Sequence, residues 1–282
     1  MSTMRTFVLA AALLASAGCG PSTGGSHNGD LANAVAAGTA PYALLDLTSG
    51  KVTYLAALPD AQSNATYKNG VMAFRRVGKD GAELFIGIFE VTQAQWQRLD
   101  PAGAPWPWQA SAIAPVVASG AISGDHPAFN ISYDMLTPAV AAFAPASGAR
   151  LRVPTSAQWE AAVGVSSGYA WGTQADRASL VAQATVRETV ITATNASSRV
   201  SGAGLIDNGG PEAVGSRTAA PTGVFDIHGN VWEWTSGGTE VRGGSWYDTA
   251  SLARAEVRAG AGQGLAADVD HALIGARLVL IP

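Results

Sequence analysis

The sequence is poor in cysteine and in charged residues. Its 282 residues include one cysteine, Cys19, which excludes intrachain disulfide bonds and any CxxC metal or redox site. Charged residues make up 13% of the chain, about half of the usual share of roughly 25%. The formal net charge is −4 and the lysines and arginines are scattered, so we expect no nucleic-acid partner. Hydrophobic residues make up 48%, which is enough for a buried core and excludes a disordered protein.

The chain also lacks an apolar run of the ~20 residues that a membrane-spanning helix needs. Its N-terminus carries a shorter run instead: Arg5 precedes apolar residues 7–15, and Ser16-Ala17-Gly18-Cys19 follows. This arrangement is typical of a secretory signal. Small residues that end at a cysteine resemble a bacterial lipobox, although Ser16 stands where that motif prefers leucine.

We therefore predict a lipoprotein signal peptide over residues 1–18, with Cys19 as the lipidated mature N-terminus. The alternative is ordinary cleavage, with Cys19 as a bystander. The predicted location is the cell envelope, where the lipid tethers the protein to a membrane. Gly20 follows the cysteine where Asp would signal retention, which favours the outer membrane if the cell is Gram-negative.

Composition also divides the mature chain. Residues 20–30 are rich in Gly and Ser, as in flexible linkers, and we predict a tether over residues 19–43 and one domain over 44–282. Residues 44–58 alternate loosely and indicate strand. Two short β-type runs, 71–74 and 84–89, flank Lys79-Asp80-Gly81, which predicts an antiparallel hairpin.

Three helix starts are predicted. Residues 92–96 and 155–159 both read T-x-x-Q-W, in which Thr caps the helix and Gln reaches back to form a capping box. The Trp that follows is placed to anchor the first turn in the core. The third start is Thr137-Pro138, with Pro at the first helical position. The second half is mostly Gly-punctuated loop, which in a compact domain must be held by Trp packing or by bound metal.

Several motifs occur in one order along the chain. They are Glu90-Val-Thr-Gln-Ala-Gln-Trp96, His126-Pro, Ile131-Ser-Tyr133, Arg152-Val-Pro-Thr-Ser-Ala-Gln-Trp-Glu160, Tyr169-Ala-Trp-Gly172, Val214-Gly-Ser216, Gly223-Val-Phe-Asp-Ile-His-Gly-Asn-Val-Trp-Glu-Trp234, Val241-Arg-Gly-Gly-Ser-Trp246 and Gly275-Ala-Arg-Leu278. Over about residues 52–281, this series resembles the sulfatase-modifying factor family, whose best-known members are formylglycine-generating enzymes. The resemblance implies a single α/β (α+β) domain with little regular secondary structure, related to C-type lectins.

The resemblance also exposes a departure from the family pattern. Formylglycine-generating enzymes carry two copper-binding cysteines after the RGGS motif, and the matching positions here are Asp248 and Ala253. A carboxylate and a methyl group do not replace a thiolate pair for Cu(I), so we expect no copper and no copper-dependent formylglycine formation. Trp232 and Ser245 match the family's oxygen and substrate pocket. Asp248 is either a new ligand-contacting or acid–base group, or the partner of an arginine that holds the last loop.

Calcium is the cofactor that the sequence predicts. Asp226 and Glu233 are oxygen donors separated by a Gly turn, and the carbonyls of Gly229 and Val231 can face the same centre, which suits Ca²⁺. These four positions also match a calcium site of the family. The alternative is that Asp226 is a turn residue and Glu233 pairs with an arginine. The resemblance implies a second calcium site at Asn195, Ala196, Asp207 and Gly209, with a slightly shifted spacing.

The sequence is compatible with two functions. The first is a tethered, calcium-stabilised binding module, a pseudoenzyme that presents its cleft to an envelope protein, peptide or glycan. The alternative is an oxidoreductase of altered mechanism, of the non-heme-metal or siderophore- or peptide-maturation type, that uses Asp248, Ser245 and Trp232. The four histidines (27, 126, 228 and 271) show no metal-ligand spacing, and we assign His228 a packing role.

Overall fold

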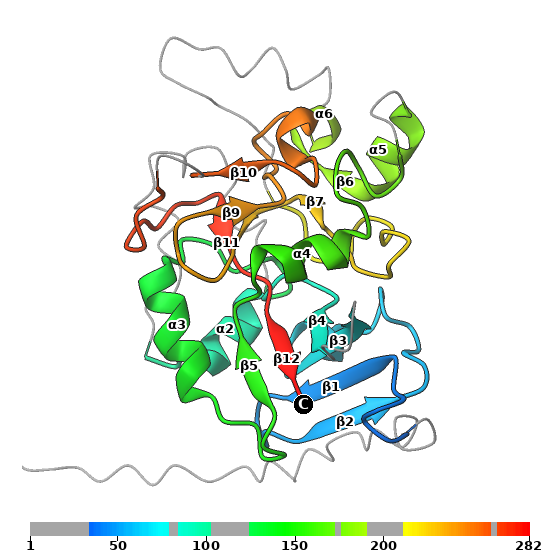
Figure 1. Ribbon diagram of the computed structural model, residues 1–282, viewed down its shortest axis with the longest axis vertical. Coiled ribbons are helices and arrows are strands. Elements are labelled where there is room, and N and C mark those ends of the chain that lie inside the picture. Colours follow the sequence, from blue (N-terminus) through cyan, green and yellow to red (C-terminus); the bar gives the residue numbers. More distant parts are fainter. Residues whose placement is uncertain (1–33, 79–83, 103–123, 173–175, 191–210, 261–263) are drawn as a thin grey trace, which may run out of the picture. The chain divides into compact units, whose positions relative to one another are not determined.

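The computed structural model describes residues 34–78, 84–102, 124–172, 176–190, 211–260 and 264–282. Its largest element is a six-stranded sheet in the order β2-β1-β3-β4-β12-β5, in which every neighbouring pair is antiparallel. The strands are β1 (Tyr42–Asp46), β2 (Val52–Leu55), β3 (Val71–Val77), β4 (Leu84–Gly87), β5 (Arg150–Arg152) and β12 (Val279–Ile281). The C-terminal strand thus lies between β4 and β5 (Figure 1).

Two smaller sheets are built from very short strands. β8 (Trp232–Trp234), β9 (Val241–Arg242), β10 (Arg258–Ala259) and β11 (Ile274–Gly275) pair in the order β10-β9-β8-β11, with β8 and β11 parallel. β6 (Ala184–Thr185) and β7 (His228–Gly229) form a parallel pair. The prediction that the second half is mostly loop is therefore confirmed over the ranges 211–260 and 264–278.

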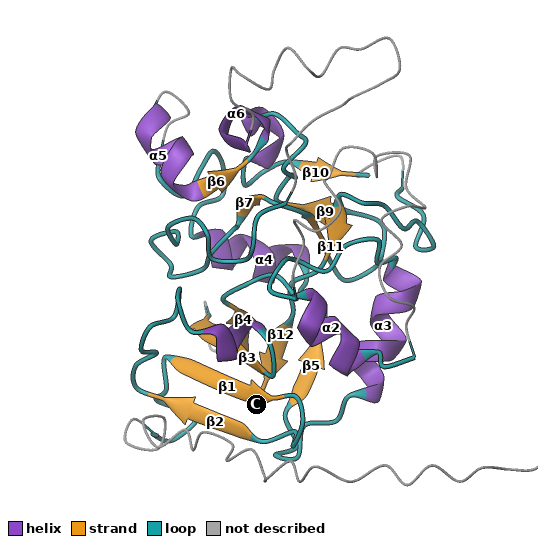
Figure 2. Cartoon of the chain, turned by 180° about the vertical axis from the view of Figure 1, so that it is seen from behind, coloured by secondary structure: helices purple, strands orange, loops and turns teal. Residues whose placement is uncertain are grey.

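The helices are also short. They are α2 (Gln93–Leu99), α3 (Tyr133–Ala142), α4 (Ser156–Val163), α5 (Arg177–Gln183) and α6 (Arg187–Val190), together with the 3₁₀ helices η1 (Ala65–Lys68) and η5 (Ala250–Ala253). Helix α4 lies between the large sheet and the short strands β7 and β9 in both views (Figures 1 and 2). No helix in the described ranges combines the length and the apolar character that a membrane span requires.

Both predicted capping boxes are present. Thr92 accepts a hydrogen bond from Gln95 N–H while the Gln95 side chain accepts one from Thr92 N–H, and Thr155 and Gln158 repeat this arrangement in α4. Each cap contributes about 1 kcal/mol to the stability of its helix. The tryptophans that follow, Trp96 and Trp159, are buried. The predicted hairpin is confirmed as β3 paired with β4, although its turn residues 79–83 lie outside the described ranges.

Tryptophan packing holds the loop-rich half onto the rest of the domain. Trp96, Trp234 and Trp246 belong to one buried cluster that also contains side chains from the large sheet. The indole N–H of Trp234 donates to Ile131 O at 2.7 Å, which satisfies its polar group inside this core. The cluster therefore links α2, β8 and the loop after β9 through buried apolar area, the largest stabilising contribution to a folded domain.

The structure corrects two sequence predictions. Helix α3 begins earlier than Thr137-Pro138, because Ser132 is its N-cap and accepts from Met135 N–H, and Pro138 lies inside the helix. The domain also begins earlier than residue 44. Residues 34–43 were assigned to the tether, but Val35 N–H donates to Tyr54 O and Arg76 donates to the carbonyls of Ala37 and Ala40. The predicted signal peptide and Cys19 lie outside the described residues.

Candidate functional site

The segment from Asp226 to Trp234 positions the candidate site. Its backbone conformation explains why Gly and Asn occur in it. Asp226, Gly229 and Asn230 all have positive φ, at 56°, 98° and 60°, a region that Gly and Asn tolerate best. A Cβ on Gly229 would lie 2.0 Å from Thr185 O, across the β6–β7 pair. Glycine is thus required at this position for backbone packing.

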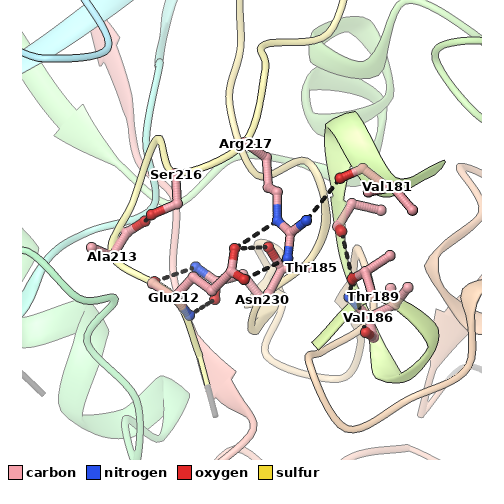
Figure 3. A network of polar contacts seen from close by, with 10 residues as sticks. Val181, Thr185, Val186, Thr189, Glu212, Ala213, Ser216, Arg217 and Asn230 are labelled. Carbon is pink, nitrogen blue, oxygen red and sulfur yellow. Dashed lines mark hydrogen bonds and ion pairs between the residues drawn. The ribbon is translucent and has the colours of Figure 1, made fainter. Parts of the chain in front are cut away.

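Asn230 joins this loop to three other segments. Its backbone N–H donates to Thr185 O at 2.7 Å, and its side-chain oxygen accepts from Glu212 N–H at 2.9 Å. Its amide Nδ2 donates to Glu90 Oε2 at 2.6 Å. Figure 3 shows this amide beside Glu212, whose carboxylate is held in turn by Arg217. The backbone and the buried side chain of Asn230 therefore fix this segment to β6, to the segment around Glu212 and to the motif that begins at Glu90.

Glu233 is held by protein donors on both of its carboxylate oxygens. Arg277 Nη2 donates to Oε1 at 2.7 Å, Arg277 Nε lies 3.1 Å from both oxygens, and Trp159 Nε1 donates to Oε2 at 2.6 Å. Both Glu233 and Arg277 are buried. Arg277 Nη1 also donates to Gly87 O and Nη2 to Phe225 O. The Glu233–Arg277 pair therefore links β8 to Trp159 of helix α4 and to the large sheet.

Two more buried carboxyl groups surround Arg277. Glu90 accepts from Val231 N–H at 3.0 Å and from Asn230, and Asp226 Oδ2 accepts from Gly215 N–H at 2.6 Å. Burial raises the pKa of Glu90 well above its ordinary value, and repulsion from Asp226 and Glu233 adds to that increase. Burial likewise raises the pKa of Asp226 to about 6. Arg277 thus lies among three acids, and burial shifts Glu90 and Asp226 toward their uncharged forms.

This arrangement does not fit the calcium ion predicted at Asp226, Gly229, Val231 and Glu233. A cation at Glu233 would have to displace the Arg277 guanidinium, which would then be buried without its carboxylate, at a cost of several kcal/mol. The contacts match the alternative instead, with Asp226 in a turn and Glu233 paired with an arginine. The second predicted set, Asn195, Ala196, Asp207 and Gly209, lies outside the described residues. No three His, Cys, Asp or Glu side chains in the described ranges gather to hold a metal ion.

Trp232, Ser245 and Asp248, the three candidates for the family cleft, do come together. Trp232 Nε1 donates to Asp248 Oδ2 at 2.7 Å, and Ser245 Oγ donates to the same oxygen at 2.5 Å. Asp248 N–H donates to Ser245 O, and Asp248 O accepts from Arg187 N–H at 2.8 Å. Trp232 and Ser245 are buried, whereas Asp248 is half-buried. The backbone and one carboxylate oxygen of Asp248 are therefore fixed, and the group stays accessible.

The alternative role of Asp248, an ion pair that holds the last loop, is wrong for the described residues. Within them Arg254 pairs with Glu256 and Arg258 with Glu160, and Asp248 forms no ion pair with an arginine. His271 lies near enough to Asp248 for the charge of the carboxylate to act on its imidazole. Burial lowers the pKa of His271, and the negative charges of Asp248 and Asp270 oppose that decrease.

Sequence reasoning missed both His271 and Glu90 as parts of this region. His271 lies far from Asp248 in the chain and within irregular structure, so no spacing rule connects them. Glu90 carried one usable signal, since it is an acid directly after an apolar strand in a chain with few charges. The packing role of His228 agrees with its contacts: Nδ1 lies 2.6 Å from Ala253 O and Nε2 accepts from Ala170 N–H, while burial lowers its pKa to about 4.

Comparisons with known proteins agree with this architecture. The family model of the sulfatase-modifying factor enzyme 1-like domain matches residues 66–280, whereas a search of curated proteins found no match. Among solved structures, Treponema denticola variable protein 1 is similar at a TM-score of 0.53 and 18% identity, covering 75% of this chain and 96% of its own. PvdO from Pseudomonas aeruginosa is similar at a TM-score of 0.52 and 19% identity, covering 75% and 84%.

At these identities the two solved structures show a shared fold alone. They confirm the predicted fold class, a mixed α+β domain with little regular secondary structure. The family model covers most of the chain and includes every motif from Glu90 onward. This protein therefore belongs to the sulfatase-modifying factor family.

Proposed function

We propose that this domain is a binding module of an envelope lipoprotein, and that the centre of its cleft is the Asp248 carboxylate. The observation that carries the proposal is the shared contact of Trp232 Nε1 and Ser245 Oγ with Asp248 Oδ2. In the family, the position of Asp248 belongs to a copper-binding cysteine. Here a hard, anionic oxygen group occupies it, which suits hydrogen-bond donors and cations rather than Cu(I).

The chemistry of Asp248 suggests what the ligand offers. An ionised carboxylate is an acceptor only, with about four lone-pair sites, and two of them are taken by Trp232 and Ser245. Within the described residues the other sites have no partner, so they can accept from an ammonium or guanidinium group, and such charge-assisted contacts are the stronger kind of hydrogen bond. We therefore assign the cleft to a ligand with a cationic group, presented by a peptide, a glycan or a partner protein of the envelope.

The proposed membrane tether rests on the N-terminal sequence. In this account Cys19 carries the lipid, and the segment after it allows the domain to reach ligands near the membrane surface. Mass spectrometry of the mature protein tests the anchor, because a lipidated chain begins at Cys19 and an ordinary cleaved one does not carry the lipid mass.

The variant Asp248→Asn tests ligand binding without disturbing the fold. The Asn oxygen still accepts from Trp232 and Ser245, so Asp248→Asn is expected to leave the melting temperature nearly unchanged. The variant loses the negative charge, and a charge-assisted hydrogen bond is worth about 1.5–3 kcal/mol, so binding of a cationic ligand should weaken by about tenfold or more. The measurement is binding of the purified full chain to an array of lysine- and arginine-containing peptides and amino-glycans.

Asp270→Asn is the matched control, because Asp270 is exposed and its removal takes the same charge from the same neighbourhood. Ligands bound by the wild type should be retained by Asp270→Asn and lost by Asp248→Asn. If the array yields no ligand for the wild type, or if Asp248→Asn binds every ligand as tightly, the proposed role of Asp248 is wrong.

The second candidate is an oxidoreductase that uses the same cleft. It is favoured by the retention of Trp232 and Ser245 next to an accessible acid, with His271 nearby. Such an enzyme would have to bring a redox-active metal or an organic cofactor to this place. Metal content and oxygen uptake separate it from the binding module.

A further inference from the structure

A concave site lies away from the Asp248 carboxylate. It is a groove of about 1000 Å³ between the end of β3 and helix α4, and neither Trp232, Ser245 nor Asp248 lines it. Its walls include Arg75 and Arg76 of β3, Glu160 of α4, and the segment 164–167 that follows the helix. A groove of this size is within the range of small-molecule sites.

Arg75 is the main polar feature of the groove. Its Nη1 donates to Tyr42 Oη at 2.6 Å, and its guanidinium lies over the Tyr42 ring at 5.3 Å from the centroid. The side chain is half-buried, and it packs against Gly223, where a Cβ would lie 3.1 Å from Nη1. Within the described ranges no carboxylate pairs with it. Arg75 is therefore a positioned cation with unused donors.

Among the described residues, the other charged groups of the groove have contacts of their own. Glu160 is its acid, but Oε1 of Glu160 already accepts from Arg242 and Arg258. Arg76 also lines the groove, but its guanidinium donates to backbone carbonyls and lies over the Phe85 ring. Among the described residues, Arg75 is therefore the charged group of the groove that can serve an anion, and a positive group of this kind attracts anions.

The groove also offers neutral hydrogen-bonding groups opposite β3. Ser166 and Ser167 line it and are exposed. Thr222 lines it as well and donates its hydroxyl to Ala162 O at 2.6 Å, which keeps its oxygen available as an acceptor. A planar guanidinium matches a carboxylate in a bidentate way, and hydroxyl groups can satisfy the remaining polar atoms of the same ligand.

We propose that the groove between β3 and α4 binds a small carboxylate-bearing ligand, with Arg75 as its ion-pairing residue. This site is independent of the Asp248 cleft, so each can fail without the other. The ligand enters between the strand and the helix, and its carboxylate meets the side of the Arg75 guanidinium that Tyr42 does not occupy.

Citrate is the test probe, titrated calorimetrically into the purified full chain at low ionic strength. We expect measurable binding to the wild type, a loss of about tenfold or more in Arg75→Gln, and a smaller loss in Arg75→Lys, which keeps the charge but not the bidentate guanidinium. Arg150→Gln is the matched control, because Arg150 is exposed on the edge strand β5 and its loss should change the affinity by less than about twofold.

Several outcomes would overturn the proposal. They are the absence of citrate binding to the wild type, equal binding by Arg75→Gln, or an equal loss in Arg150→Gln, which would indicate a general charge effect. Inorganic phosphate is the second probe: binding as tight as that of citrate would overturn the assignment to a carboxylate. If Arg75→Gln does not fold, Arg75→Lys and the comparison of citrate with phosphate on the wild type still decide the question.

Discussion

Replacing Arg277 by methionine is expected to lower the free energy of unfolding by about 3–5 kcal/mol, the usual cost of removing one partner of a buried ion pair. Arg277 is fully buried and donates to Glu233, to Gly87 O and to Phe225 O. Methionine fills much of the space but supplies no donor. Glu233 would keep its charge inside the core without compensation, and two carbonyls would lose their partners.

The measurement is denaturant unfolding of the variant and the wild type at the same pH. Arg150→Met is the control, since this exposed arginine should change the free energy of unfolding by no more than about 0.5 kcal/mol. Adding Glu233→Gln to Arg277→Met should recover part of the loss, because Gln removes the orphaned charge and still accepts from Trp159 Nε1. A loss below about 1 kcal/mol in the single variant would contradict the central role assigned to this pair.

Replacing Asp226 by asparagine is expected to raise the free energy of unfolding at pH 8 by up to about 3 kcal/mol. Burial raises the pKa of Asp226 from its ordinary value of 3.8 to about 6, against the opposing effects of Gly215 N–H and Arg277. A change of this size corresponds to about 3 kcal/mol. Asparagine stays neutral, still accepts from Gly215 N–H, and tolerates the positive φ at this position.

The stability gained in Asp226→Asn should depend on pH. Because the folded-state pKa lies above the unfolded one, the folded protein prefers the protonated carboxyl. Its contribution is complete below about pH 4 and is lost as the pH rises through 6, so the advantage of the variant should grow over that window and vanish at pH 4. Asp270→Asn, at an exposed residue, should show no such pH-dependent gain.

The same variant tests the calcium hypothesis. If Asp226 is a calcium ligand in solution, Asp226→Asn should be less stable than the wild type at pH 8 with calcium present. The contacts of Glu233 and Arg277 predict instead that Asp226→Asn is more stable than the wild type, both with calcium and with EDTA. If the wild type is more stable than Asp226→Asn only when calcium is present, Asp226 is a calcium ligand, as the sequence predicts.

Local chemistry made part of this structure predictable. The two T-x-x-Q-W starts were identified because a capping box uses residues three positions apart, and the β3–β4 hairpin because its strands are neighbours in the chain. The third helix start was predicted too late, at Thr137-Pro138, because proline is common at the first helical position. The helix begins after Ser132, which provides its side-chain cap, and Pro138 lies inside it. The tether boundary was misplaced because residues 34–43 are held by backbone contacts that leave little trace in composition.

The site was harder to predict because its contacts are non-local. The resemblance brought Trp232, Ser245 and Asp248 together, and the structure agrees. The sequence predicts calcium at Glu233 because a carboxylate that binds a metal and one that pairs with an arginine look alike in sequence, and in the structure Glu233 pairs with Arg277. Arg277 lies 44 positions away, and no periodicity joins the two. Arg75 likewise carries no motif, since only its position beside α4 makes it a groove residue.

The most direct test of the central claim, that the Asp248 cleft binds rather than oxidises, is one measurement on the purified full chain. Redox-active metal content and oxygen uptake are determined in the same sample, in the presence of reductant and of a ligand found on the peptide and glycan array. For a binding cleft we expect neither copper nor iron at one per chain and no oxygen uptake above the buffer. Stoichiometric copper or iron, with oxygen uptake that Asp248→Asn abolishes, would contradict the central claim.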